Sequence, residues 1–500
     1  MEINRDSIIL KNDITCFSDT INNECKTEID SNSVSKILGI YVKAVNSEGE
    51  ILENSIKYKS AIIYSICYID NEKNIRKSEC LGEICGEIKG TTSKGYLHID
   101  IKPEKVEADI SSLKLILKGI FKVTATITDF RKSEFVSPTE NLIVKKEDCE
   151  YYKSYGKRKT VFPIEEEFEL GYSISNVLMH KITPVITSVQ CGVGCIIVDG
   201  EVHIFALLLQ NSEKRDIIKE EKVVPFRAEI DYEEAMPSMI ATAEVFEKNF
   251  KTDVSVDEEG NSCTVNANIS LLLEGEAFSV VNSVICDDAF SLTNDIETKF
   301  IVENKVTPKE QKNLRVDLIS SPLSVDGVEE TEFILCAYEN VDITETKRDK
   351  GNLLVYGVLS YTAFFRNNEG EIITRRIEYP FETKLDVNLS NKDNYRISAD
   401  VICVTPNGFN NGEIIVKYSI NFVVFCEEID KVKLLMDVSL GEEKKSEKSS
   451  ISVYISMPDE DLWSLSKRLN TPPEEICETN KELQFPLSGK ERIVVYRQKK

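Results

Sequence analysis

The sequence has 500 residues, a hydrophobic fraction of 41% and a formal net charge of -24. A single hydrophobic core does not grow to this size, so we expect three or four domains. The acidic balance argues against nucleic acid as a partner, because binding to a phosphate backbone needs clustered lysine and arginine. No apolar run approaches the roughly 18 residues of a membrane-spanning helix, so we expect no membrane span.

Residues 1–29 are polar and show no clear hydrophobic period, so we expect a loosely held lead-in. They lack the basic segment and apolar block of a secretory signal, and we therefore expect no export. In a chain that stays in the cytoplasm, cysteines remain reduced. We expect the 14 cysteines to be free thiols, mostly buried. Those inside apolar strands are Cys67, Cys336, Cys403 and Cys426.

A pattern of strand, polar turn and second strand occurs three times along the chain. In each copy, alternating positions would share the inward face of the first strand. These positions are Ile56, Tyr58, Ser60, Ile62, Tyr64, Ile66 and Tyr68 in copy one; Ile196, Val198, Gly200, Val202, Ile204, Ala206 and Leu208 in copy two; and Leu353, Val355, Gly357, Leu359, Tyr361, Ala363 and Phe365 in copy three.

The ends of the second strands support the same alignment. Copies two and three end in Pro225-Phe226 and Pro380-Phe381, and the weakest copy has Leu81-Gly82 there. Hairpins resemble one another in general, so chance is the alternative. The agreement in order over a whole hairpin favours repeats.

We therefore expect a mainly β chain, built from tandem antiparallel β-sandwich-like repeats and a small α+β domain. The expected segments are a polar lead-in at 1–29, a degenerate first repeat at 30–135, a connector at 136–159, a second repeat at 160–300, a third repeat at 301–430, a charged linker at 431–450 and the α+β domain at 451–500.

Signatures of enzymes are absent from the sequence. The segment Cys191-Gly-Val-Gly-Cys195 comes nearest to a metal or nucleotide motif, but zinc needs further ligands, and a tight glycine turn is the simpler interpretation. The histidines are His98, His180 and His203. His203 beside Asp199 and Glu201 could form an acid-histidine site, although a half-exposed strand face predicts the same residues. We expect no enzymatic activity, no metal and no cofactor.

The last fifty residues predict a strand, two helices and a strand. Residues 451–455 alternate as a strand, and Leu462, Leu465 and Leu469 recur at helical spacing. The second helix is expected to start at Thr471-Pro-Pro-Glu474, with the threonine as cap of a capping box, and to end near Asn480. The order βααβ closes with residues 492–496.

This order and these residues resemble a LysM domain. The resemblance rests on residues 461–471 for the first helix, 475–480 for the second, and 487–489 for the turn before the last strand. It implies a groove for a partner or a glycan that is formed by Asp459, Glu460, Asp461, Leu462, Trp463, Asn480, Leu483, Phe485 and Leu487. LysM domains have Gly-Asp-Thr where this chain has 459–461, and the loss of the glycine and the threonine hydroxyl speaks against sugar binding.

Three sheet-rich repeats followed by a LysM-like domain resemble the clostridial spore coat morphogenetic proteins of the SipL type, which carry SPOCS domains. The resemblance implies a non-enzymatic adaptor in the mother-cell cytoplasm that localises to the forespore surface and the spore coat. Its partners would be the basal-layer ATPase, stage IV sporulation protein A, and other coat proteins, with the LysM-like domain as binding module. The alternative is a cell-wall or cortex protein that binds peptidoglycan through that domain. An enzyme with a site assembled across the repeats is a third hypothesis, which no motif supports.

Overall fold

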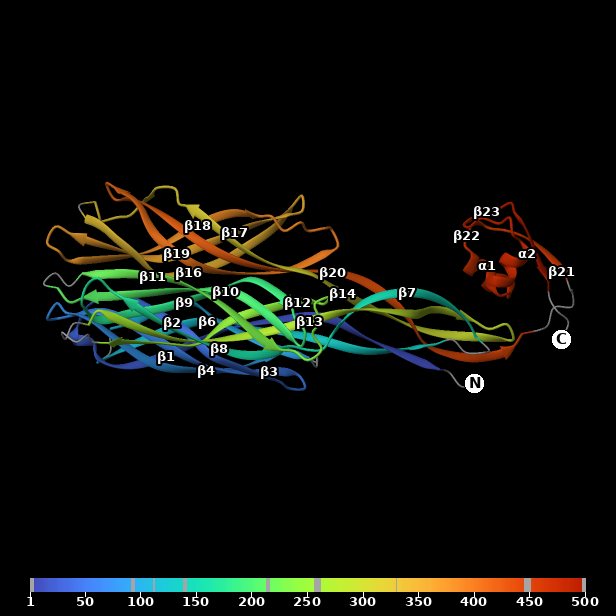
Figure 1. The fold of residues 1–500 in the computed structure, drawn as a ribbon, viewed down its shortest axis with the longest axis horizontal. Helices are drawn as coiled ribbons and strands as arrows, with labels where there is room; N and C mark the ends of the chain where they lie inside the picture. The colour runs from blue at the N-terminus through green and yellow to red at the C-terminus, as the bar shows by residue number, and fades with distance from the viewer. Residues whose placement is uncertain are drawn as a thin grey trace.

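The molecule is elongated and built almost entirely of antiparallel strands (Figure 1). The computed structural model describes residues 4–90, 95–110, 113–137, 142–212, 216–255, 262–329, 331–444 and 451–496. Strands make up 79% and helices 4%, which confirms the prediction of a mainly β fold. No helix among these residues is long and apolar enough to cross a membrane. Three β units gather at one end, a narrow stalk leads away from them, and a small C-terminal module lies near the far end of the stalk.

The first unit consists of two three-stranded sheets. The first sheet has the strand order β1 (Arg5–Asp30), β6 (Lys114–Val136), β5 (Tyr96–Asp109). The second sheet has the order β2 (Val34–Ile51), β3 (Ser55–Asp70), β4 (Ile75–Lys89). The two facing sides bury a common core that includes Ile62, Tyr64, Phe121 and Val123. Because side chains alternate between the faces of a strand, the apolar positions of each sheet point into this core.

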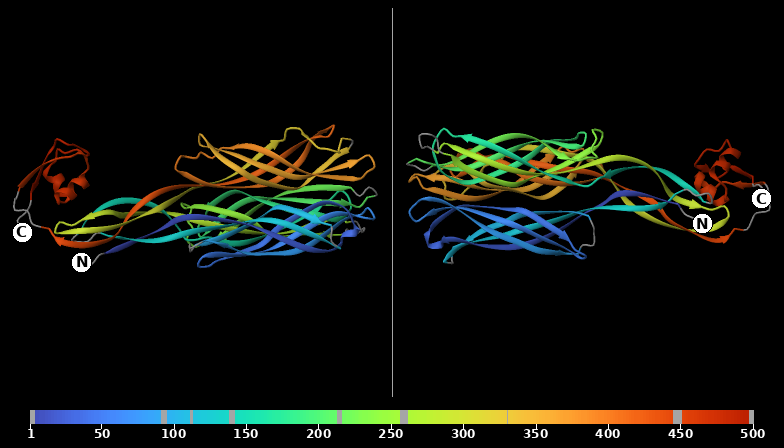
Figure 2. Two further views of the ribbon diagram at one scale, coloured as in Figure 1. Left: turned by 180° about the vertical axis from the view of Figure 1, so that it is seen from behind. Right: turned by 60° about the horizontal axis from the view of Figure 1, so that its bottom comes forward.

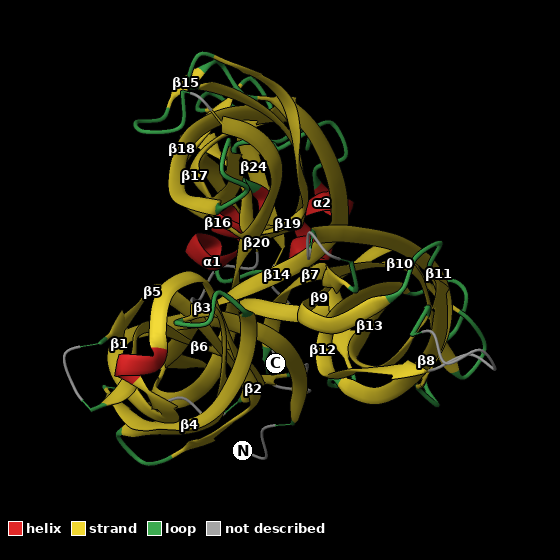
Figure 3. Cartoon of the chain, turned by 90° about the vertical axis from the view of Figure 1, so that its left-hand side faces the viewer, coloured by secondary structure: helices red, strands yellow, loops and turns green. Residues whose placement is uncertain are grey.

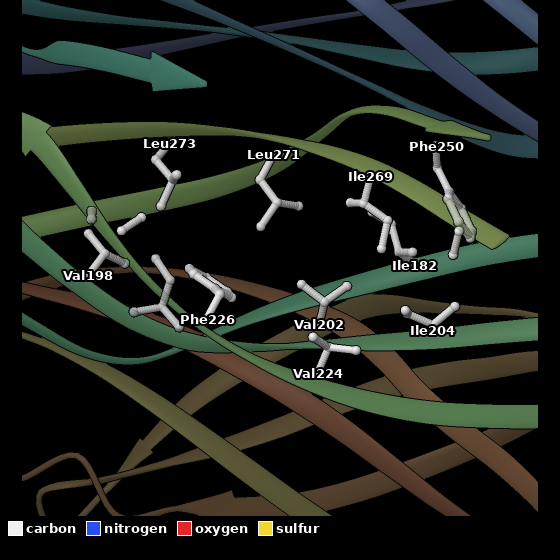
Figure 4. Packing of buried hydrophobic residues seen from close by; sticks show 14 of the residues in the cluster. Ile182, Val198, Val202, Ile204, Val224, Phe226, Phe250, Ile269, Leu271 and Leu273 are labelled. Carbon is white, nitrogen blue, oxygen red and sulfur yellow. The ribbon is translucent and has the colours of Figure 1, made fainter. Parts of the chain in front are cut away.

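The second and third units repeat this arrangement of strands. The second has the sheets β9 (Ile174–Cys191), β10 (Cys195–Gln210), β11 (Ile217–Asp231) and β12 (Ile240–Ser255), β13 (Thr264–Phe290), β7 (Ile143–Ser154), with β8 (Arg158–Glu169) also on β13. The third has β16 (Thr331–Asp349), β17 (Asn352–Asn367), β18 (Ile372–Leu385) and β14 (Asn294–Ile319), β20 (Glu413–Glu443), β15 (Leu323–Ser324), with β19 (Asp393–Asn410) also on β20. Figure 4 shows how the second core packs between its sheets.

In every unit the long last strand pairs with the first strand, and a three-stranded meander lies between them in sequence. In the second unit β7 and β8 together take the place of the single first strand. A common origin of the units as copies of one repeat stays a prediction. Viewed along the molecule, the units surround a common centre (Figure 3).

Cross-strand pairs explain why Pro-Phe recurs. Gly200 lies opposite Phe226, and Gly357 lies opposite Phe381. A Cβ atom on Gly357 would come within 2.6 Å of the Phe381 ring, which covers the glycine. In the first unit Ser60 lies opposite Ile84, so Leu81-Gly82 was the wrong counterpart. The inward positions predicted from the alternation are buried in all three copies, except the half-buried Tyr68.

The stalk is formed by strand segments from all three units: residues 5–11, 130–136, 143–154, 278–290, 294–308 and 427–443. It stays narrow in the further views of Figure 2. Two small apolar clusters hold it together, and they include Leu10, Phe135, Ile285, Leu434 and Leu435.

The stalk corrects three sequence predictions. The lead-in expected at 1–29 belongs from Arg5 onward to strand β1, whose residues 5–11 lie in the stalk and whose remainder pairs with β6 in the first unit. Residues 1–3 lie outside the described residues. The connector at 136–159 contains β7, and the linker at 431–450 continues β20 as far as Glu443. Residues 445–450 of that linker lie outside the described residues. These strands bury only a narrow face in the stalk, and the polar side chains on their open faces hide the alternation.

The cysteines are expected to be free thiols. The sulfur atoms of Cys25 of β1 and Cys80 of β4 are in contact within the first unit. The other 12 are free. Cys67, Cys336 and Cys426 are buried as expected, whereas Cys403 is half-buried. Burial raises the pKa of the Cys426 thiol to about 11, which keeps it protonated at neutral pH.

Candidate functional site: the C-terminal module and the stalk tip

The C-terminal module has the α+β order predicted from the sequence, with two short strands added. Its elements are β21 (Ile451–Ile455), β22 (Pro458–Glu460), α1 (Leu462–Leu469), α2 (Pro473–Thr479), β23 (Leu487–Ser488) and β24 (Arg492–Tyr496). The helices pack on the β21–β24 pair around Leu465, Leu469, Ile476 and Ile493. The likeness to LysM remains a resemblance in residues and in order.

The two predicted walls of the groove lie side by side. Strands β22 and β23 pair, which sets Pro458 opposite Ser488 and Glu460 opposite Leu487. Leu462, Leu483 and Phe485 are half-buried against the core of the module. The loop before α1 and the segment after α2 are therefore neighbours, as the resemblance implied.

Several predicted site residues have structural roles instead. Glu460 is buried, and its two carboxylate oxygens accept hydrogen bonds from Arg468 Nε at 2.7 Å and Nη2 at 2.8 Å. These bonds hold the pKa of Glu460 below its usual value. Asn480 closes the edge of β24, donating to the Val494 carbonyl and accepting from its amide at 2.8 Å. Leu487 is a core residue.

The acidic loop also differs in detail from the expectation. Asp459 is exposed and has a φ of 58°, a left-handed conformation that short polar residues tolerate. Asp461 is the N-cap of α1, and its carboxylate accepts from the Ser464 amide at 2.6 Å. The capping box expected at Thr471 is absent: α2 begins at Pro473, and the Thr471 hydroxyl donates to the Leu469 carbonyl instead.

Trp463 contacts the tip of the stalk, which we define as residues 287–293 at the end of β13 and in the turn that follows. Its indole Nε1 donates to Asp288 Oδ2 at 2.8 Å, and its ring meets the Phe290 ring edge to face, with centroids 5.3 Å apart. Trp463 is half-buried, whereas Phe290 is buried. The chain's only tryptophan thus lies between the module and the stalk.

Sequence reasoning missed the neighbours of Trp463 on α1. Lys467 Nζ donates to Asp288 Oδ1 and Oδ2 at 3.0 and 2.9 Å, and Asn470 Nδ2 donates to the Leu292 carbonyl at 2.8 Å. Although burial opposes it, the hydrogen bonds from Trp463 and Lys467 hold the pKa of Asp288 below its usual value. Trp463 and Lys467 are four residues apart and share one face of α1, and Asn470 follows as the C-cap of the helix. The sequence alone could have shown the shared face.

A second feature, a cavity of about 1410 Å³ between the three units, was not predicted. Strands β2, β5, β9, β12, β16 and β19 line it, and each lies at the edge of its sheet. Side chains from other units form hydrogen bonds with unpaired backbone groups of these edge strands. The Gln311 side chain accepts from the Ala243 amide at 2.9 Å and donates to the Ala243 carbonyl at 2.7 Å. Thr183 donates to the Val401 carbonyl at 3.1 Å. Covering edge strands in this way prevents their pairing with other chains.

The remaining candidate motifs behave as local structure. Cys191 and Cys195 flank a tight turn in which Gly192 donates to the Cys195 carbonyl at 2.8 Å and Gly194 has a φ of 75°. The His203 side chain is only 11% exposed, because the third unit covers the strand face expected to be half open. Its Nε2 lies 3.5 Å from Glu201, and burial lowers its pKa. Within the described ranges, no group of three or more His, Cys, Asp or Glu side chains is arranged to hold a metal ion.

These features define a mainly β protein with three sheet-built units and a small α+β module at the end of a stalk. Residues 173–255 match the family model described as SipL, SPOCS domain. The matched segment runs over β9, β10, β11 and β12 of the second unit and includes Gly200 and Phe226. The match supports a SipL-type protein, in agreement with the resemblance found in the sequence. No curated protein and no solved structure gives a match to the chain.

Proposed function

We propose that the chain is a non-enzymatic spore coat morphogenetic adaptor. It acts in the mother-cell cytoplasm at the forespore surface and links the coat basal-layer ATPase, stage IV sporulation protein A, to other proteins of the assembling coat. The observation that carries this proposal is the SPOCS match in the second unit. The elongated shape agrees with it, because units and module at opposite ends can hold different partners.

The C-terminal module is the protein-binding part of this adaptor, with Trp463 as its anchor. A large aromatic side chain buries much area at little entropic cost, and such residues dominate protein interfaces. Trp463 lies outside the core of the module, which is formed by other residues. Its face can therefore change partners without unfolding the module. The loop at 459–461 offers little to a sugar, since Glu460 is occupied by Arg468 and Asp461 by the helix cap.

A binding assay with the full chain tests this function. Immobilised coat ATPase and, separately, purified peptidoglycan are incubated with the wild type, Trp463→Ala and the control Cys477→Ser, which changes an exposed residue of α2. We expect the ATPase to retain the wild type and the control, and to lose the Trp463 variant while its circular dichroism stays unchanged. Retention by peptidoglycan alone would replace the adaptor with the glycan-binding alternative.

A further inference from the structure

The face of α1 that the proposed function assigns to a partner is covered by the protein's own stalk. Asp288 accepts all three donated hydrogen bonds from Trp463 and Lys467, and Phe290 contacts the indole ring. Lys444 bridges the two parts, donating to the Asn470 side chain and to the Ser291 carbonyl, each at 2.7 Å. The contact is thus specific in both charge and shape.

The local geometry of β13 places Asp288 for this role. The pairing of β13 with β7 shifts register between Cys286 and Asp288, so that Asp287 is an extra residue in the ladder. Such bulges redirect side chains, and they occur next to functional sites. Asp287 forms an ion pair with Lys145 of β7 at 3.0 Å, whereas the adjacent Asp288 meets the module. Asp287 therefore contacts the stalk, whereas the neighbouring Asp288 contacts the C-terminal module.

The contact is suited to reversible binding. It uses one carboxylate, one aromatic pair and two hydrogen bonds of the Asn470 side chain, one to the Leu292 carbonyl and one to Lys444. The Lys467 side chain remains 41% exposed. An ion pair with an exposed partner stabilises a contact only slightly, and a single aromatic pair adds a modest further stabilisation. A covalent tether raises the effective concentration to roughly the millimolar range, so a contact this weak can still be closed most of the time.

We propose that the stalk tip is an intramolecular docking site that shields the Trp463 face of α1 until a partner displaces it. The displacement step rests on the proposed function; the docking does not. To replace the stalk tip on α1, the partner's surface must present the same two groups, a carboxylate beside an aromatic ring. A partner of this chemistry competes directly with Asp288 and Phe290, and its apparent affinity is reduced by the fraction of molecules in the docked state.

The fluorescence of the single tryptophan reports docking in the full chain. Asp288→Lys places a cation against Lys467 and should shift the emission of Trp463 to longer wavelength and increase its quenching by acrylamide. Glu297→Lys is the matched control, because it makes the same charge change on an exposed stalk residue of β14. The combined exchange Asp288→Lys with Lys467→Asp should reverse part of this shift, because it restores the ion pair but not the acceptor of the Trp463 indole N–H. Unchanged emission in Asp288→Lys would overturn the docking.

Binding to the immobilised coat ATPase tests displacement in the same preparations. Asp288→Lys should bind more tightly than the wild type, on the order of tenfold if the docked state holds about nine molecules in ten. Equal affinities despite shifted emission would refute competition at this face. Shifted emission with no ATPase binding by either protein would support docking and reject the proposed function, so the two failures are distinguishable.

Discussion

Gly357 sets the distance between neighbouring strands in the third unit. A Cβ atom there would lie 2.6 Å from the Asp342 carbonyl oxygen of β16 and equally close to the Phe381 ring of β18. Gly200 makes the same close approaches, to Val185 of β9 and to Phe226 of β11. A glycine inside a strand marks such an approach, and the ring that covers it restores the lost burial.

Gly357→Val should therefore destabilise the protein. The new side chain meets backbone that cannot move without breaking the pairing of β16 with β17, and we expect a loss of about 1 to 3 kcal/mol in the free energy of unfolding. Gly171→Val is the control, because a Cβ there meets nothing within 4 Å and should change stability by less than about 0.5 kcal/mol. Denaturant unfolding measures both, and equal stabilities would contradict the assigned packing.

The sequence predicts the strands that bury a broad face, but it does not predict the strand segments that form the stalk. Strands β10 and β17 alternate clearly because one face of each fills a core. The sequence of strand β1 predicts a lead-in instead, since many of its residues are polar and its burial is confined to a few positions. The loop before α1 and the segment that ends in β23 lie side by side, as expected. The contact of Trp463 with Asp288 depends on a register shift in β13 that no local pattern in the C-terminal segment reveals.

Hydrogen exchange tests the assignment of β1. Residues 14–26 pair with β6 from Ile14–Thr128 to Lys26–Ile116 without interruption, and β1 is the edge strand of its sheet. The alternate amides of β1 that face β6 should therefore exchange slowly, and those on its open edge should exchange faster. Mass spectrometry of peptides from residues 14–26 gives the measurement, and the exposed loop around Gly171 provides a fast-exchanging reference. Exchange of the 14–26 peptides at the rate of this reference would support the lead-in inferred from the sequence.

At the scale of the whole molecule, the three units form one body. An apolar cluster with Leu38, Phe205 and Tyr338 joins residues from all of them, and the ion pair between Lys219 and Glu339 at 3.2 Å links the second and third units. Both side chains are almost fully buried, and Lys219 also pairs with Glu221 at 2.8 Å. Removing Lys219 would therefore take a cationic partner from the buried Glu339 carboxylate, which is costly in a protein interior. The stalk separates this body from the module, so the two lie at opposite ends of the molecule.

We propose that the chain works at the forespore surface through the coat ATPase. Fluorescence microscopy of a reporter fusion in sporulating cells tests it directly, with and without stage IV sporulation protein A. We predict a ring of fluorescence around the forespore when the ATPase is present and diffuse fluorescence in the mother cell when it is absent. A forespore ring that persists without the ATPase, or fluorescence on the cell wall, would contradict the account.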